Sequence, residues 1–143
     1  MRIAIGTDHA GFELKERLKG WLVAQGHEVR DLGTGSSESC DYPDFVVPAA
    51  RAVAAGECER GFVLGGSGNG EAIAANKVRG VRAALVHDAF TAEMARRHND
   101  ANVMSLGARV TPADKAMEFA RIFLETPFEG GRHARRIAMI AAV

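Results

Sequence analysis

The residues that could do chemistry begin with a glycine-rich segment, Gly65–Glu71, which reads GGSGNGE. It follows a predicted strand and opens a predicted helix, so its backbone N–H groups can approach and bind an anion. Four glycines in six residues are more than a tight turn requires, and Glu71 could carry a proton. The alternative is a plain turn in which Glu71 complements the helix dipole. No lysine followed by serine or threonine closes the segment, which argues against nucleotide phosphates.

A second group consists of Asp8 and three histidines. Asp8 and His9 directly follow the first predicted strand, where they suit proton transfer or binding of a polar substrate. The alternative is that Asp8 only caps the next helix. His98 ends a predicted helix, where a cation could simply complement the dipole, and His87 ends a strand as a possible site neighbour. No two histidines have a spacing such as HxxxH, so the spacing predicts no metal site.

The C-terminal segment is basic. Residues 130–143 contain three arginines and one histidine, His133, without any acid. Arg132 and Arg136 are four residues apart, which places them on one face of a helix. Two guanidinium groups on one face can hold a phosphate through forked hydrogen bonds, whereas the alternative is a solvated helix end.

Short β-type runs alternate with longer helical runs along the chain, which predicts a mostly parallel sheet with helices on both faces. Ligands of such sheets bind beyond the carboxyl ends of the strands. The polar loop Gly33–Tyr42 is long enough to act as a flap over that edge. The expected strands are Arg2–Gly6, Glu28–Leu32, Gly61–Leu64, Arg82–Val86 and Asn102–Leu106. The expected helices are Phe12–Gln25, Asp44–Ala55, Glu71–Val78, Ala89–His98, Pro112–Leu124 and Arg132–Ala142.

The composition is that of a globular domain, and the 143 residues suit a single domain over 1–143. Eighteen basic residues balance eighteen acidic ones, so no net charge favours nucleic acid or an anionic membrane as a partner. No stretch resembles a signal peptide or a membrane span, and we expect a cytoplasmic protein. Cys40 and Cys58 fit no zinc spacing and are expected to be reduced.

Taken together, these segments closely resemble the ribose-5-phosphate isomerase B family, which also contains the galactose-6-phosphate isomerase subunits. The resemblance covers essentially the whole chain. It rests on Asp8–Gly11, Tyr42–Asp44, the glycine-rich segment running into Ile73–Lys77, the pair His98-Asn99, and the tail with Arg132, His133 and Arg136. Many members carry a catalytic-base cysteine where this chain has Gly65. This chain resembles instead the subgroup in which a glutamate at the position of Glu71 is the base.

The resemblance implies a Rossmann-like three-layer α/β/α fold with a five-stranded parallel sheet. Its C-terminal helix would extend to a partner subunit, in a homodimer that shares its sites and could pair into a dimer of dimers. Catalytic roles would fall to Glu71 as base, His98 as ring opener, and Ser67, near which loop amides hold the enediolate. The residues implied to bind substrate are Asp8, His9, Tyr42, Gly66, Gly68, Asn69, Gly70, Asn99, Arg109, Arg132, His133 and Arg136.

The expected reaction interconverts an aldose phosphate and a ketose phosphate, with ribose 5-phosphate and ribulose 5-phosphate as first choice. Proton transfer through an enediolate needs no metal, flavin or nicotinamide, so no cofactor is expected. One alternative is the same chemistry on a four-carbon or six-carbon sugar phosphate. The others are a non-catalytic sugar-phosphate-binding protein, which would have no need of a base, and a flavodoxin-like nucleotide or flavin binder. Whether burial raises the pKa of Glu71 more than the helix dipole lowers it stays open at this point.

Overall fold

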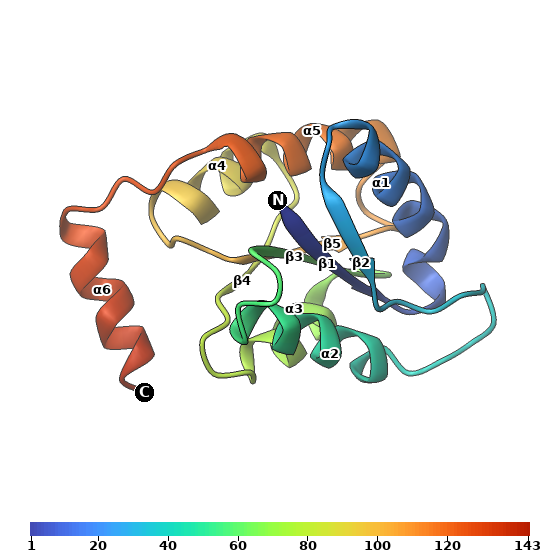
Figure 1. Cartoon of the computed structure of the whole chain (residues 1–143), viewed down its shortest axis with the longest axis horizontal. Helices are drawn as coiled ribbons and strands as arrows, with labels where there is room; N and C mark the ends of the chain where they lie inside the picture. Colours follow the sequence, from blue (N-terminus) through green and yellow to red (C-terminus); the bar gives the residue numbers. More distant parts are fainter.

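A computed structural model describes the whole chain, Met1–Val143, as a five-stranded parallel sheet covered by helices on both faces (Figure 1). The strands are β1 (Arg2–Thr7), β2 (Glu28–Asp31), β3 (Arg60–Gly65), β4 (Ala83–Leu85) and β5 (Val103–Gly107). The helices are η1 (His9–Gly11), α1 (Phe12–Ala24), α2 (Pro43–Ala54), α3 (Asn69–Asn76), α4 (Ala89–Arg97), α5 (Ala113–Glu125) and α6 (Arg132–Ala141). No helix is long and apolar enough to cross a membrane.

The strand order is β2-β1-β3-β5-β4. Strand β2 is therefore added on one side of β1, and the later strands β3, β5 and β4 lie on the other side. The reversal places a topological switch point between β1 and β3, which is where ligands of open α/β sheets bind. The registers pair Thr7 with Leu64 and Gly65 with Gly107. The residues that follow β1, β3 and β5 therefore emerge side by side at one edge of the sheet.

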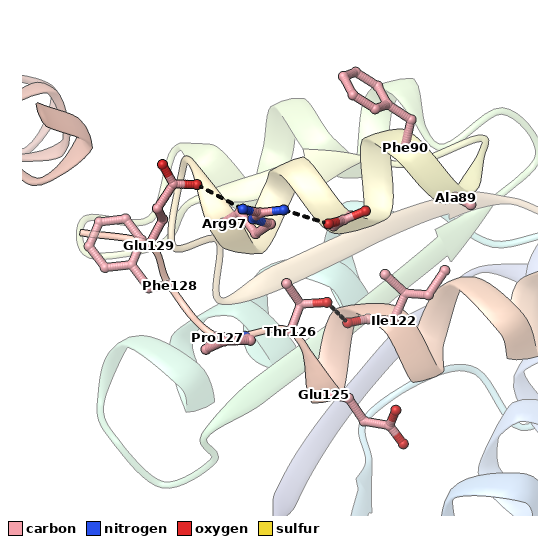
Figure 2. Close-up of a pocket in the computed structure, with 10 residues that line it drawn as sticks. Ala89, Phe90, Arg97, Ile122, Glu125, Thr126, Pro127, Phe128 and Glu129 are labelled. Atoms are coloured by element: carbon pink, nitrogen blue, oxygen red, sulfur yellow. Dashed lines mark hydrogen bonds and ion pairs between the residues drawn. The ribbon is translucent and has the colours of Figure 1, made fainter. Parts of the chain in front are cut away.

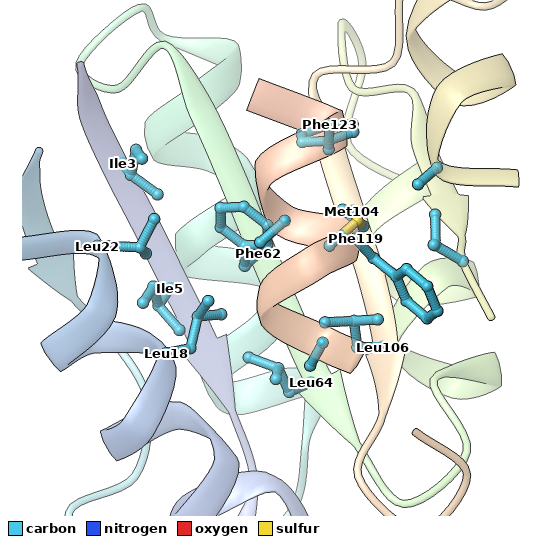
Figure 3. Packing of buried hydrophobic residues seen from close by; sticks show 14 of the residues in the cluster. Ile3, Ile5, Leu18, Leu22, Phe62, Leu64, Met104, Leu106, Phe119 and Phe123 are labelled. Carbon is cyan, nitrogen blue, oxygen red and sulfur yellow. The ribbon is translucent and has the colours of Figure 1, made fainter. Parts of the chain in front are cut away.

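Two apolar clusters fill the space between the sheet and its helices. On one face, α1, α4 and α5 pack against the strands, and Phe62 of β3 meets Phe123 of α5 edge-to-face at 5.8 Å between ring centroids (Figure 3). On the other face, α2 packs on β1 and β3 through small residues such as Ala49 and Ala50. Close packing on both faces holds the ends of the central strands rigidly.

The last helix, α6, stands away from the rest of the chain at the end of an extended linker (Figure 1). Its contact with the remainder is at its first turn, where the ring of His133 stacks on that of His98 with centroids 4.2 Å apart. Met139 and Ile140 are more than half exposed. An exposed apolar surface on a helix without an intrachain neighbour is typical of an interaction site.

The α/β fold class and the five-stranded parallel sheet that we predicted are confirmed, and each expected strand and helix is present. The loop Gly33–Tyr42 forms no helix or strand, as expected of a flap. One boundary differs with consequence for the site. Helix α3 begins at Asn69, two residues before the predicted start, because Gly68 adopts φ +83° and starts the helix inside the glycine-rich segment. Glu71 is therefore the third residue of the helix rather than its first.

Candidate active site

Asp8 is held rigidly at the carboxyl end of β1. Its side chain is buried and its Oδ1 accepts hydrogen bonds from the N–H groups of Ala10 at 3.0 Å and Gly11 at 3.4 Å. The capping role that we weighed for Asp8 is thus present, although it caps the short helix η1 rather than α1 itself. Thr7 fixes the neighbouring strand end by donating from Oγ1 to the carbonyl of Leu64 at 2.8 Å. The carboxylate keeps its second oxygen for another partner.

The glycine-rich loop is clamped onto the end of β5. The carbonyls of Gly65 and Gly66 accept from the N–H groups of Ala108 at 2.7 Å and Arg109 at 3.0 Å. The buried hydroxyl of Ser105 donates to the carbonyl of Gly68 at 2.7 Å. These bonds engage the loop carbonyls, whereas the first N–H groups of α3 have no partner within the helix. The loop is therefore held in a fixed arrangement, in which a substrate oxyanion would compete for the N–H donors with Ser67 Oγ, which accepts from Asn69 at 3.2 Å, and with the Glu71 carboxylate.

Glu71 projects back from α3 into the end of the sheet. Its side chain is only 4% exposed. A Cβ placed on Gly65 would lie 1.7 Å from Glu71 Oε1, so the carboxylate occupies the space that a side chain at position 65 would need. Burial raises the pKa of Glu71, and the charge of Asp8 raises it further, against a lowering by the N–H groups of Glu71 and Gly68. Burial thus outweighs the helix terminus, and the carboxylate is tuned toward a general base.

The polar flap reaches over this edge through two contacts. The backbone N–H of Cys40 donates to Nδ1 of His9 at 3.2 Å, which leaves the proton of a neutral ring on Nε2. Tyr42 lies against Gly70, where an added Cβ would meet its hydroxyl oxygen at 2.6 Å. At the start of the flap, the buried Lys15 donates to the carbonyl of Thr34 at 2.8 Å. The flap therefore holds His9 and Tyr42 beside the glycine-rich loop.

Arg109 completes the carboxyl edge. Its guanidinium lies beside Gly66, with Nη1 at 3.0 Å from the position of a Cβ there, and the structure gives that group no acidic partner. An exposed guanidinium without an acidic partner, beside the glycine-rich loop, suits an anionic ligand. Ser67 and Asn69 also line a pocket of about 210 Å³ that lies beyond the ends of β4 and β5.

The other predicted site residues lie at the opposite edge of the sheet. His98 ends α4, and the carbonyl of Asn99 accepts from Arg82 Nε at 3.0 Å, immediately before β4 begins. The separation follows from the fold, because a five-residue strand such as β5 spans roughly 15 Å between its two edges. One protomer thus brings together Asp8, His9, Tyr42, Gly66, Ser67, Gly68, Asn69, Gly70, Glu71 and Arg109, but not His98, Asn99, Arg132, His133 or Arg136.

The second group is organised around Glu129, which sequence reasoning did not single out. Glu129 lies 3.8 Å from Nε2 of His98 and 3.8 Å from Nε2 of His133, and its Oε2 is 3.3 Å from Arg97 Nη2. Burial lowers the pKa of His133, and the charges of His98 and Arg132 lower it further. Beside this group, Glu129 and Arg97 help to line a groove of about 770 Å³ between α4 and the linker to α6 (Figure 2). The spacing of Glu129 four residues before His133 was the available signal.

Comparison with known proteins agrees with this geometry. The model of the Ribose/Galactose Isomerase family matches residues 3–140. Ribose-5-phosphate isomerase B of Escherichia coli is 43% identical over 142 residues, which cover 99% of this chain and 95% of that protein. The solved structure of Clostridium thermocellum ribose-5-phosphate isomerase B superposes with a TM-score of 0.98 at 48% identity, covering 99% of this chain and 96% of that one.

A further solved structure contains a ligand. Ribose-5-phosphate isomerase B from Mycoplasma genitalium, with bound ribulose-5-phosphate, superposes with a TM-score of 0.95 at 39% identity, covering 99% of this chain and 94% of that one. The family match spans nearly the whole sequence, and the similarity to these proteins extends over both edges of the sheet. The chain therefore belongs to the Ribose/Galactose Isomerase family.

Proposed function

We propose that this protein interconverts ribose 5-phosphate and ribulose 5-phosphate, with Glu71 as the base, in sites that two copies of the chain build together. The observation that carries the proposal is the buried carboxylate of Glu71, which lies against Gly65 at the mouth of the glycine-rich loop. A base of raised pKa next to a row of fixed N–H donors is what an enediolate reaction requires.

In this mechanism the carboxylate of Glu71 takes the proton from C2 of the open-chain aldose. The electron pair of the broken C–H bond forms the C1–C2 double bond, and the carbonyl oxygen at C1 becomes an oxyanion. Glu71 then returns the proton to C1, while the hydroxyl proton of C2 passes to the oxygen at C1, so that C2 becomes the ketone and C1 becomes a hydroxymethyl group. Burial of Glu71 supports both proton transfers, because a carboxyl group of raised pKa accepts a proton readily and still releases it.

We assign the stabilisation of the enediolate oxygens to the N–H groups at the start of α3. The loop backbone is already fixed by the bonds to Ala108, Arg109 and Ser105, so it need not move when charge develops. Asp8, whose charge acts on Glu71, and Tyr42, which lies against Gly70, are assigned to the sugar hydroxyls. Ser67, at the tip of the loop, lies with the donors rather than with the base.

The phosphate and the ring oxygen are assigned to groups from both edges of the sheet. His9 and Arg109 supply cationic or N–H donors at the carboxyl edge. Arg132 and Arg136 are exposed on α6, and neither guanidinium has an intrachain acidic partner. His98 of the partner subunit would open the sugar ring, with Asn99 of the partner subunit holding a hydroxyl. Fixing a phosphate at one end of the substrate orients C2 toward the base.

A homodimer follows from this division of residues. In one protomer the two groups lie at opposite edges of the sheet, so no single copy can close both around one sugar. Helix α6 is unsupported within its own chain and exposes Met139 and Ile140. We assign a second copy of this chain to that surface, because it would carry the basic face of α6 to the carboxyl edge of its partner.

The test of the substrate assignment is a panel of aldose phosphates with four, five and six carbons. We expect kcat/KM to be highest for ribose 5-phosphate. A six-carbon 6-phosphate with the higher kcat/KM would reassign the chain within its family, and binding of every sugar phosphate without turnover would reduce it to a binding protein.

A further inference from the structure

The side chains of His98, Glu129 and His133 form a compact cluster at the first turn of α6. One potential ligand atom from each residue lies within 4.8 Å of those of the other two. The two imidazole rings are stacked at an interplanar angle of 14°, and the Nε2 atom of each faces the carboxylate of Glu129. Two imidazole nitrogens and a carboxylate oxygen are a ligand set that zinc sites use.

The cluster contains an unsatisfied atom. His133 is 6% exposed, and its Nε2 is buried without a hydrogen-bond partner. The nearest acceptor, Glu129 Oε1, lies at 3.8 Å, which is beyond hydrogen-bonding distance. Buried polar atoms without a partner are rare in folded proteins and call for a missing ligand. This nitrogen points at the same carboxylate as Nε2 of His98, so one ion between them would satisfy all three groups.

A tetrahedral ion would draw the three side chains closer together. With metal–ligand bonds of about 2.1 Å, neighbouring ligand atoms of a tetrahedral site are about 3.4 Å apart. The distances of 3.8 Å join His98 to Oε2 and His133 to Oε1 of Glu129, and the ligand atoms of the three residues lie within 4.8 Å of one another. Closing around one ion therefore requires shifts of up to about 1.4 Å and a rotation of the stacked rings toward the ion. Arg97 Nη2, at 3.3 Å from Glu129 Oε2, orients the carboxylate as an outer partner. The side chains of His98 and Glu129 are more than a third exposed, which leaves an entry path and a fourth position for water.

We propose that His98, Glu129 and His133 bind a divalent transition-metal ion, with Zn²⁺ as the best match, and that this binding inhibits the isomerase. The inhibitory part rests on the proposed function, in which Nε2 of His98 must be free to open the sugar ring. A metal ion would take up that lone pair and would stand in the shared pocket. Arg97 and the arginines of α6 are nearby cations, so the site favours reversible binding over permanent occupancy.

The spacing of the histidines predicted no metal site, and the structure shows why spacing was uninformative here. His98 and His133 come from different helices and meet only because the linker carries α6 back toward the end of α4. The carboxylate comes from the linker itself.

The experiment measures Zn²⁺ binding to the full chain by calorimetry, with Co²⁺ absorption as a second readout, and isomerase rates in the same preparations. We expect one ion per chain. At a free Zn²⁺ concentration of about ten times the dissociation constant, the isomerase rate should fall to roughly a tenth of the metal-free rate, and EDTA should restore it. Glu129→Gln keeps the side-chain shape but removes the charged ligand, so it should lose both binding and inhibition. His133→Ala should do the same, and each rate is compared with that variant's own metal-free rate.

Two matched controls locate the ion. His87→Ala removes an exposed histidine beside an aspartate, and Cys40→Ser removes the thiol that lies 3.9 Å from His9. Both variants should stay inhibited as wild type does. The proposal would be overturned if the chain bound no Zn²⁺. It would also be overturned if Zn²⁺ inhibited Glu129→Gln as strongly as wild type, or if it failed to inhibit Cys40→Ser. If the metal-free wild type still turned over ribose 5-phosphate normally, the isomerase assignment would stand after any of these outcomes. Binding without inhibition would overturn the inhibitory role and the ring-opening role of His98 together.

Discussion

The carboxylate of Glu71 fills the space beside Gly65, so closely that a Cβ on residue 65 would stand 1.7 Å from Oε1. Gly65 and Glu71 are therefore one unit, in which the absence of a side chain at the end of β3 makes room for an acid from the first turn of α3. In relatives with a cysteine at position 65, the thiol would stand at this same place. The proton carrier would thus keep its position while its chemistry changes.

The first prediction tests this pairing through Gly65→Ala. The added methyl group must displace the Glu71 carboxylate, and misplacement of a catalytic group by about 1 Å costs roughly 100-fold in rate. We expect kcat to fall by about that factor in steady-state assays, in a protein with a native circular dichroism spectrum. Gly20→Ala is the control, since no atom lies within 4 Å of its added Cβ. Equal activity of both variants would show that the carboxylate needs no such space.

The second prediction concerns the pH dependence of stability. Burial raises the pKa of Glu71 above its ordinary value of 4.5, so the ionised form destabilises the folded state. The contribution to stability is full below the unfolded pKa and is lost as pH rises through the folded pKa. Glu71→Gln should therefore have a higher Tm than wild type at about pH 8, and the difference should vanish near about pH 4. Thermal unfolding at both pH values measures it, and a pH-independent difference would contradict the raised pKa.

The third prediction concerns the phosphate anchor on α6. Each charge-assisted hydrogen bond to phosphate is worth about 1.5–3 kcal/mol. Arg136→Ala should therefore raise KM for ribose 5-phosphate by roughly 10- to 100-fold with the fold intact. Arg135→Ala is the matched control, because Arg135 is an exposed neighbour on the same helix. If the two variants have the same KM, the basic face of α6 is solvated and holds no phosphate.

The fourth prediction tests whether each site takes residues from two copies. Glu71→Gln and His98→Asn should each be inactive alone. When the two are unfolded together and refolded, half of the dimers are mixed, and one site in each mixed dimer is intact. Activity should therefore recover to about a quarter of wild type. A site contained within one protomer would carry one defect in every copy, so no recovery above the parents would exclude a shared site.

The fold was predictable from the sequence because its central strands are short apolar runs, and because glycine follows α1 and α2 and proline follows α5 within two residues. Runs such as Gly61–Leu64 are buried on both sides, which is why they contain no polar alternation. The start of α3 was misjudged because Gly68 reads as a loop residue, whereas its positive φ begins the helix. The two extra residues make Glu71 the third residue of the helix instead of its first.

The candidate site was predictable only in part. Residues that follow strands, such as Asp8 and Glu71, could be assigned to one edge from the βα pattern alone. The direction in which the pKa of Glu71 shifts could not be predicted from the sequence. It depends on burial of the carboxylate against Gly65 and on the charge of Asp8. The spacing of Glu129 and His133 was visible in the sequence, but their grouping with His98 was not, since the course of the linker between α5 and α6 has no signature in the sequence.

The measurement that bears on the proton carrier itself is isotope exchange by Glu71→Gln. Wild type and variant are incubated with ribose 5-phosphate in deuterated water, and deuterium at the carbon beside the carbonyl is followed by NMR together with turnover. Loss of a general base costs about 10²–10⁴-fold, so we expect exchange and kcat to fall together by that factor while the variant still binds the sugar. Cys40→Ser and Cys58→Ser should exchange as wild type does. Near-normal exchange by Glu71→Gln would show that another group carries the proton, with Asp8 the next candidate.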